Sequence, residues 1–225
     1  MRTPGEDFDL AAGFCLTEGV VESYGGIIHL GYCGEAGGEA GSVVNVLTDS
    51  EAPKPRPDRA MESRSGCGIC GVRILDDLRL RVPVLESGFT IEASSLASMQ
   101  YHMLEQQRLF KSTWGGTHAV ALAHRDGQLI VVREDVGRHN AMDKVIGCAI
   151  RSGIDCGKCA VLMSSRISFE MVQKAVRAGI TLVAAISTAT SLAVELAESS
   201  GCTLVGRLRD DDMYVYTHPY RVLGQ

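Results

Sequence analysis

The 225-residue chain lacks the features that mark membrane, secreted and nucleic-acid-binding proteins. No apolar run approaches the roughly 20 residues that a membrane-spanning helix needs. Residues 1–7 are acidic and do not show the basic-then-apolar pattern of a signal peptide. The formal net charge of −5 and the isoelectric point near 5.7 give no basic surplus for nucleic acid or an anionic membrane. We therefore predict a cytoplasmic protein with no membrane segment and no nucleic-acid partner.

Several catalytic motifs are also missing. The sequence has no Gly-x-x-x-x-Gly-Lys-[Ser/Thr] phosphate loop, which excludes a P-loop ATPase, and no Gly-x-Ser-x-Gly nucleophile elbow. None of the six histidines is followed two residues later by glutamate, and Gly66 rather than proline precedes Cys67. The signature of a zinc deaminase is therefore absent.

Eight cysteines are present in a chain that is 45% hydrophobic and 22% charged, as in ordinary globular proteins. An extracellular disulfide framework is one explanation for so many thiols. The large apolar content and the lack of an export signal favour a reducing cytosol instead. In that compartment a Cys-x-x-Cys motif more often binds a metal or takes part in catalysis.

The segment Ser65-Gly66-Cys67-Gly68-Ile69-Cys70-Gly71 holds two thiols among three glycines. Glycine leaves the backbone free and leaves the sulfur atoms uncovered, which predicts an open and mobile loop. Arg64 lies three residues before Cys67. Because a nearby cation favours the reactive thiolate, Cys67 is a candidate nucleophile. Taken alone, the motif fits half of a zinc site, a redox dithiol or two cysteines with no special role.

The rest of the chain weakens the zinc and redox interpretations. A second pair, Cys156 and Cys159, lies much farther away than the spacing of a zinc ribbon allows. These two cysteines also fit a simple position at the edge of the strand that begins near Ala160. A thioredoxin-like motif would follow a strand and begin a helix, whereas prolines at 53, 55 and 57 precede Cys67. Exposed thiols beside an α/β body fit sulfur handling, in which a thiolate accepts sulfur as a persulfide and passes it on.

The hydrophobic pattern alternates between strands and helices, which predicts an α/β fold with a mostly parallel sheet and helices on both faces. A capping box at Thr3–Glu6 predicts a first helix that begins there and ends near Gly19. Ser94 or Ser95 is expected to cap a helix that continues to Phe110. Asp126-Gly127 predicts a hairpin. The expected strands are 27–30, 43–47, 119–123, 129–132, 160–163, 180–186, 203–205 and 213–217, and the later helices are 141–149, 168–178 and 191–198.

Two polar segments are candidates for ligand binding. Arg138, His139 and Lys144 lie where a strand passes into a helix, so they fit either an anion site or a solvated loop with a capping network. The segment 206–212 carries two arginines and three aspartates between the last two strands. The residues alone favour a plain charged turn there.

Several motifs together resemble those of the FdhD family, the formate dehydrogenase accessory sulfurtransferases. They occur in the family's order along nearly the whole chain. The matching segments are Arg2-Thr3-Pro4-Gly5, Gly13-Phe14, Thr17-Glu18-Gly19, Ser65–Gly71, Gly115-Gly116-Thr117-His118-Ala119, Glu134–Lys144, Ser165-Arg166, Lys174-Ala175 and Val215-Tyr216-Thr217-His218-Pro219.

The resemblance implies a sulfur carrier, or sulfurtransferase, that takes persulfide sulfur from a cysteine desulfurase. The protein would deliver this sulfur to molybdenum bis(molybdopterin guanine dinucleotide), the cofactor of formate dehydrogenase. Cys67 would carry the persulfide and Cys70 would assist. The cofactor-binding segment maps to Arg207, Leu208, Arg209, Asp210, Asp211 and Asp212, which replaces the charged-turn interpretation.

The resemblance also implies a homodimer and a cytidine-deaminase-like three-layer body without the zinc. We expect a smaller α+β N-terminal region with the Cys-x-x-Cys loop at 1–90 and the α/β domain at 91–225. Two alternatives remain: a non-catalytic chaperone that binds the molybdenum cofactor, and a structural zinc module that uses both cysteine pairs. Family members usually have a further segment before Arg-Thr-Pro, so we expect Met1 to be an internal methionine or a truncated start.

Overall fold

The computed structural model describes residues 1–33, 43–49, 82–86, 88–209 and 212–224. The helices are α1 (Asp7–Thr17), α3 (Ala93–Gln106), α4 (Arg108–Ser112), α5 (Arg138–Arg151), α6 (Phe169–Arg177) and α7 (Ser191–Ser200). The strands are β1 (Ile27–Tyr32), β2 (Val44–Thr48), β3 (Ile91–Glu92), β4 (His118–Ala123), β5 (Leu129–Asp135), β6 (Ala160–Met163), β7 (Leu182–Ala185), β8 (Thr203–Arg209), β9 (Asp212–Val215) and β10 (Val222–Leu223).

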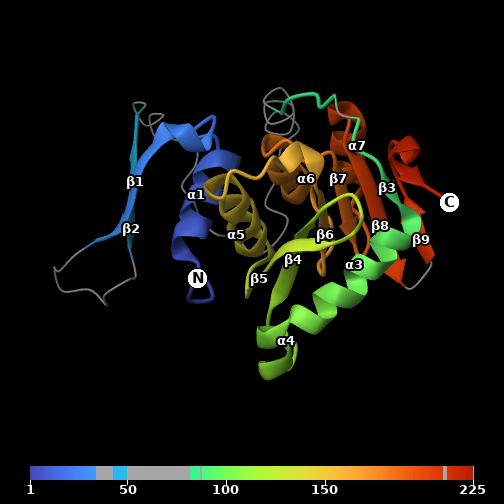
Figure 1. The fold of residues 1–225 in the computed structure, drawn as a ribbon, viewed down its shortest axis with the longest axis horizontal. Coiled ribbons are helices and arrows are strands. Elements are labelled where there is room, and N and C mark those ends of the chain that lie inside the picture. Colours follow the sequence, from blue (N-terminus) through green and yellow to red (C-terminus); the bar gives the residue numbers. More distant parts are fainter. Residues whose placement is uncertain (34–42, 50–81, 87, 210–211, 225) are drawn as a thin grey trace.

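A six-stranded sheet in the order β5-β4-β6-β7-β8-β9 forms the centre of the body (Figure 1). Only the pairs β6–β7 and β7–β8 are parallel, whereas β4–β5, β4–β6 and β8–β9 are antiparallel. The prediction of a mostly parallel sheet was therefore wrong. The connections explain the difference, because the turns at both ends of the sheet are too short for the crossover that parallel neighbours require.

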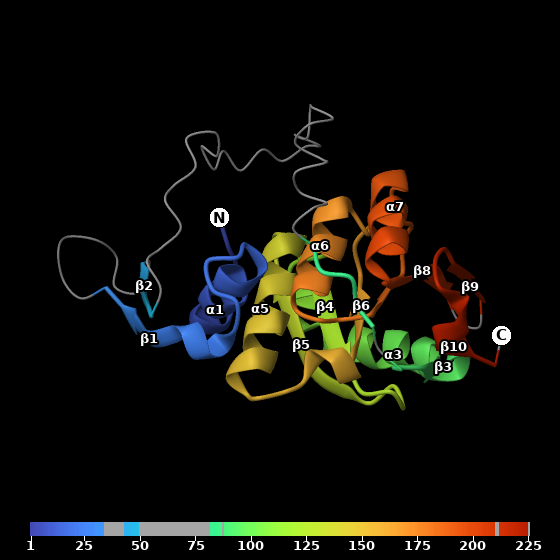
Figure 2. The same ribbon diagram turned by 90° about the horizontal axis from the view of Figure 1, so that it is seen from above.

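Helices cover both faces of this sheet, as the sequence predicts (Figure 2). Along β6, Val161 and Met163 pack with α5, α6 and α7, while Ala160 and Leu162 point to the other face. That second face is covered by α3, through side chains such as Met99. The alternation follows the two-residue period of a strand. The expectation of a three-layer α/β body is confirmed.

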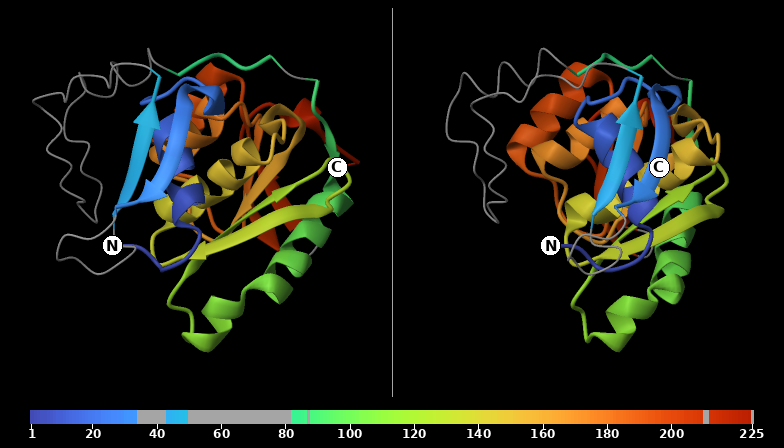
Figure 3. Two further views of the ribbon diagram at one scale, coloured as in Figure 1. Left: turned by 60° about the vertical axis from the view of Figure 1, so that its left-hand side comes forward. Right: turned by 90° about the vertical axis from the view of Figure 1, so that its left-hand side faces the viewer.

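Helix α1 packs closely against α5, and the β1–β2 ribbon lies beside α1 (Figure 3). Two glycines make the close approach possible. A Cβ atom on Gly13 would lie 1.9 Å from the Asp143 carbonyl oxygen, and one on Gly147 would lie 1.8 Å from the Asp9 carbonyl oxygen. The division of the chain at residue 90 stays a prediction.

Two helices end where the sequence predicts. Gly179 and Gly201 adopt the positive φ expected just after a helix, and the helices before them end as predicted. In contrast, α1 begins at Asp7 with Glu6 as its N-cap residue, so the capping box at Thr3 was wrong. The next long helix, α3, begins at Ala93, before the predicted serine cap, and is interrupted at Gln107.

Candidate functional site

Polar residues from several elements meet at the edge of the sheet where β6 and β7 end. Val120 is paired with Met163, and His118 is paired with Asp135, so the start of β4 and the end of β5 reach this edge. The Ser164 hydroxyl accepts a hydrogen bond of 2.9 Å from the Ala119 backbone N–H. In open α/β sheets, ligands bind outside the carboxyl ends of the parallel strands. This edge is therefore the candidate functional site.

Two histidines lie close to Arg138 at this edge. Burial lowers the pKa of both His118 and His139, and the nearby Arg138 guanidinium lowers both further. Lys174 also lowers the pKa of His139, while Glu170 raises it. Both imidazoles are thus mainly neutral near pH 7, and each can accept as well as donate a hydrogen bond.

Lys144 belongs to a structural network rather than to a ligand site. Its side chain is completely buried, and its Nζ atom lies 3.0 Å from an Asp135 carboxylate oxygen. The ammonium also donates to the Thr3 carbonyl oxygen at 3.0 Å, while Asp135 accepts from the Thr3 backbone N–H. The N-terminal segment is thereby held against the start of α5. Lys144 is therefore part of a buried ion pair, which is neither the solvated loop nor the helix cap that one interpretation expected.

A second buried ion pair joins α1, α5 and α6. The Lys174 Nζ atom lies 3.0 and 2.9 Å from the two carboxylate oxygens of Asp143. It also donates to the Thr17 hydroxyl at 2.9 Å and to Glu18 at 3.0 Å. Burial raises the pKa of Asp143, and Lys174 and Thr17 oppose that shift. The matching segments Thr17-Glu18-Gly19 and Lys174-Ala175 therefore meet in one network.

The predicted cofactor segment begins on β8 and ends at the first residue of β9, two antiparallel strands that are here called the β8–β9 hairpin. Arg207 and Arg209 lie in β8 and are exposed, and Asp212 begins β9 and is also exposed. The Leu208 side chain is fully buried in the core, so only its backbone can contact a ligand. Arg207 has a φ of 53°, and its N–H donates to the Ser187 carbonyl oxygen at 2.8 Å. Residues 210 and 211, both aspartates, lie outside the described residues.

Tyr214 and Tyr216 lie beside this segment, and of the two only Tyr216 belongs to a motif that the sequence pointed to. Tyr214 is paired with Gly206 across the hairpin, and the two tyrosine rings lie 4.9 Å apart. The signal was present in the strand Met213-Tyr214-Val215-Tyr216, where aromatic and aliphatic residues alternate with the period of a half-buried strand.

The thiols of Cys67 and Cys70 lie outside the described residues. The other Cys-x-x-Cys pair is buried at the edge of β6, one of the positions that the sequence predicts for it. Burial raises the pKa of Cys156 to about 12 and that of Cys159 to about 11. Within the described ranges, no three His, Cys, Asp or Glu side chains gather closely enough to hold a metal ion.

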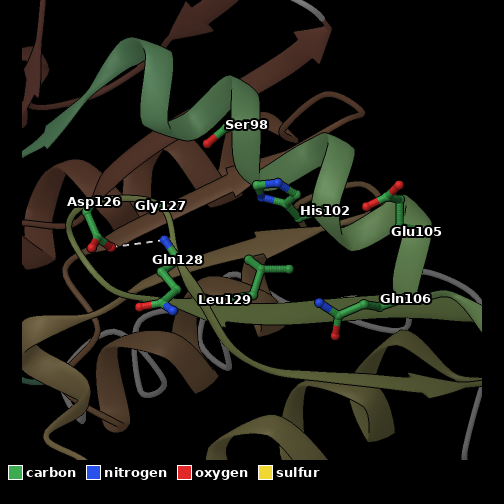
Figure 4. A pocket seen from close by; sticks show the side chains of 8 residues that line it. All are labelled: Ser98, His102, Glu105, Gln106, Asp126, Gly127, Gln128 and Leu129. Atoms are coloured by element: carbon green, nitrogen blue, oxygen red, sulfur yellow. Dashed lines mark hydrogen bonds between the residues drawn. The ribbon is translucent and has the colours of Figure 1, made fainter.

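A pocket of about 430 Å³ lies between α3 and the turn that joins β4 to β5 (Figure 4). His102, Glu105 and Gln128 are among its lining residues, and the turn is closed by a hydrogen bond of 3.0 Å from the Gln128 N–H to Asp126. The turn lies beyond Ala123, which pairs with the first residue of β6. The pocket is therefore at the opposite edge of the sheet and contains none of the predicted site residues.

Comparisons with known proteins agree with the motifs. The model of the FdhD/NarQ family matches residues 1–223. Sulfur carrier protein FdhD of Mycolicibacterium paratuberculosis is 44% identical over 230 residues, which cover 99% of this chain and 84% of the relative. The protein of the same name from Mycobacterium tuberculosis is 43% identical over 233 residues, with coverage of 99% and 84%.

A comparison with a solved structure agrees with the family match. The crystal structure of a protein described as a formate dehydrogenase accessory protein, from Desulfotalea psychrophila, superposes with a TM-score of 0.77 at 26% identity. The superposition covers 99% of this chain and 82% of that one. Among the described residues, none of the helices combines the length and the apolar composition that a membrane span requires. The family match along residues 1–223 and the identity to these relatives show that the chain belongs to the FdhD/NarQ family.

Proposed function

We propose that the chain is a sulfur carrier that supports formate dehydrogenase in the cytoplasm. Cys67 accepts sulfur as a persulfide from a cysteine desulfurase, and the protein passes this sulfur to molybdenum bis(molybdopterin guanine dinucleotide). The observation that carries the proposal is the 44% identity, over 99% of the chain, to a relative named as a sulfur carrier.

The loading step needs a thiolate that can reach the desulfurase. The Cys67 thiolate attacks the outer sulfur of the desulfurase persulfide, a new S–S bond forms on Cys67, and the desulfurase cysteine leaves as a thiolate. The reaction is an exchange with no net oxidation. Glycines on both sides of Cys67 and a nearby Arg64 suit this role, because they favour access and the ionised thiol. Cys70 assists in the same segment.

Four of the six described thiols are poor alternatives to Cys67, because they are buried. Burial raises the pKa of Cys15, Cys156, Cys159 and Cys202, so their thiolates are scarce at neutral pH. Cys33 is exposed and Cys148 is half-buried. A buried pair at the edge of β6 therefore cannot replace the pair at 67 and 70 as a carrier.

The proposed binding segment for the cofactor lies on the β8–β9 hairpin. Arg207 and Arg209 are exposed and offer guanidinium groups that bind phosphate through charge-assisted hydrogen bonds. Asp210, Asp211 and Asp212 complete the proposed cofactor segment. The segment begins beside Ser187, just beyond the end of β7, which is where ligands bind in such sheets. Assembly as a homodimer is also part of the proposal.

Sulfur loading tests the proposal. The protein is incubated with a cysteine desulfurase and cysteine, and its intact mass is measured before and after treatment with a thiol reductant. We expect wild type and Cys156→Ala to gain one reducible sulfur atom and Cys67→Ala to gain none. Loading of Cys67→Ala to the wild-type level would overturn the assignment of Cys67.

Formate dehydrogenase activity in cells distinguishes a sulfur carrier from a chaperone that only binds the cofactor. Formate dehydrogenase is produced in cells whose own accessory protein has been replaced by wild type, Cys67→Ala or Cys156→Ala. A carrier requires Cys67, so we expect activity with wild type and Cys156→Ala only. Full activity with Cys67→Ala would favour the chaperone.

A further inference from the structure

Helix α4 and the turn that follows it form an exposed projection, residues 108–116, which is here called the α4 projection. Every residue of this segment is exposed to solvent. Figure 1 shows the segment beyond the edge of the sheet, next to the start of β4. It carries three large apolar side chains, Leu109, Phe110 and Trp114. Exposed apolar side chains that gather in one place mark an interaction surface, whereas ones scattered singly are ordinary.

Trp114 holds its indole ring in solvent at a cost to the backbone. The φ of this residue is 55°, in the left-handed region where glycine is the usual residue after a helix. The residue is 98% exposed, so packing within the described part of the chain does not offset the strain. A bulky residue kept in a strained conformation without packing indicates a functional role.

The backbone of the α4 projection is fixed by a buried carboxylate. Glu134, near the end of β5, accepts hydrogen bonds from the Leu109 N–H at 2.8 Å and the Phe110 N–H at 2.7 Å. It also accepts one from the Thr117 hydroxyl at 3.0 Å. After the helix, the Gly115 N–H donates to the Phe110 carbonyl oxygen at 2.9 Å. The segment is therefore ordered before a partner arrives, which reduces the entropy lost on binding.

Charge on the α4 projection is positive, although the whole chain has a net charge of −5. The sequence from 106 to 125 contains no aspartate or glutamate, and both Arg108 and Lys111 are exposed. Tryptophan and arginine are enriched among the residues that dominate binding energy in protein interfaces. This surface fits a protein partner that offers an apolar pocket for the indole and carboxylates for the two cations.

The place of the α4 projection in the fold indicates which protein this partner is. Helix α4 continues through Thr117 into β4, whose first residues lie at the edge of the sheet where β6 and β7 end. The proposed cofactor segment begins beside Ser187 at the same edge. An enzyme that takes up the cofactor has to approach this edge. We infer that the α4 projection is the docking surface for cofactor-free formate dehydrogenase, with Trp114 as its central anchor, an inference that rests on the proposed function.

Trp114 is the only tryptophan in the sequence, which allows a direct measurement. Protein produced with 5-fluorotryptophan carries a single fluorine label, so its fluorine NMR spectrum has one signal. The source organism's own formate dehydrogenase, purified without its molybdenum cofactor, is then added unlabelled. We expect the signal to shift and broaden until the added enzyme saturates the labelled protein. A signal that stays sharp and unshifted in a severalfold excess of the enzyme would overturn the inference.

Substitution of the anchor separates docking from folding. Trp114→Gly relieves the positive φ, so the variant should be at least as stable as wild type in urea titrations. Its affinity for the cofactor-free enzyme, measured by calorimetry, should fall roughly tenfold or more. Ile28→Ala is the control, because it removes an exposed apolar side chain from β1 and should bind as wild type does. Wild-type affinity in Trp114→Gly would overturn the inference.

The cations of the α4 projection should set the salt dependence of binding. The double variant Arg108→Glu with Lys111→Glu should bind the cofactor-free enzyme more weakly than wild type, and added salt should then change the affinity less. An affinity and a salt dependence equal to those of wild type would show that the partner offers no carboxylates, which would overturn the partner chemistry inferred above.

Two other occupants give different results. Sedimentation should find wild type and Trp114→Gly in the same oligomeric state. Loss of a dimer in Trp114→Gly would assign the surface to a second copy of the chain and overturn the inference. Vesicles of phosphatidylglycerol and phosphatidylcholine should leave the fluorine signal unchanged. A signal that responds to vesicles and not to the enzyme would assign the surface to a membrane, with the same consequence.

Sulfur loading of the same variant keeps the two proposals distinguishable. Trp114→Gly should load one sulfur at Cys67 as wild type does, because the indole takes no part in that step. Normal loading with unchanged binding of the cofactor-free enzyme would overturn only the docking role. Absence of loading in wild type would overturn the proposed function, while the fluorine measurement would still decide whether the α4 projection binds the enzyme.

Discussion

At the scale of single residues, burial decides which described thiols can react. With the pKa of Cys156 raised to about 12, only about one molecule in ten thousand carries its thiolate at pH 8. Cys33 is exposed. We predict that iodoacetamide at pH 8 alkylates Cys33 in the folded protein while Cys156 and Cys159 stay unmodified, as peptide mass mapping would show. In urea all three should react. Alkylation of Cys156 as fast as Cys33 without urea would contradict the prediction.

A buried ion pair gives a second prediction at this scale. In Lys174→Met, the Asp143 carboxylate loses the ammonium that contacts both of its oxygens. An unpaired charge buried in this way should lower the free energy of unfolding by about 3–5 kcal/mol in urea titrations. Adding Asp143→Asn should restore part of that loss, because the amide carries no charge. A Lys174→Met protein as stable as wild type would show that the ion pair between Lys174 and Asp143 contributes nothing to the free energy of unfolding.

The stability of Lys174→Met should change with pH in a defined direction. Burial raises the pKa of Asp143 above its unfolded value, and Lys174→Met removes the main opposing contact. Between the unfolded and the folded pKa, the folded state therefore holds a proton that the unfolded state releases, so stability falls as pH rises. The deficit of Lys174→Met relative to wild type should be larger at pH 7 than at pH 4. A deficit that grows on acidification would contradict this sign.

At the scale of elements, local patterns predicted the β4–β5 hairpin and the helix ends at Gly179 and Gly201. These features depend on residues that are neighbours in the sequence. The start of α1 was wrong because Thr3 contacts Asp135, which lies 132 residues away, instead of capping the helix. The prediction of mostly parallel strands was wrong for the same reason. Packing between distant segments decides which strands become neighbours.

The crossing of α1 over α5 depends on two glycines, which gives an element-scale prediction. Gly147→Ala would place a methyl group 1.8 Å from the Asp9 carbonyl oxygen, so the helices must move apart. We expect a loss of about 1–3 kcal/mol in the free energy of unfolding. The control is Gly88→Ala, because a Cβ there meets nothing within 4 Å. Equal stability of the two variants would contradict the close crossing.

At the scale of the whole molecule, charge in the sequence did not distinguish exposed groups from buried ones. The charged residues of 206–212 alone favoured a plain turn, and Arg207 and Arg209 in this segment are exposed at the β8–β9 hairpin. The same charge criterion included Lys144, which is completely buried against Asp135. The place of Tyr214 beside Gly206 was not predicted, because it comes from strand pairing. Residue type therefore suggests chemistry, while pairing between distant segments decides which groups are available.

The most direct test of the account follows sulfur from donor to cofactor. The protein is loaded with ³⁵S by a cysteine desulfurase, freed of the enzyme and of free sulfide, and mixed with molybdenum bis(molybdopterin guanine dinucleotide). In wild type, the label should leave Cys67 and appear in the re-isolated cofactor, whereas Cys67→Ala should transfer none. Label that stays on the wild-type protein, or that reaches the cofactor equally well with Cys67→Ala, would contradict this expectation.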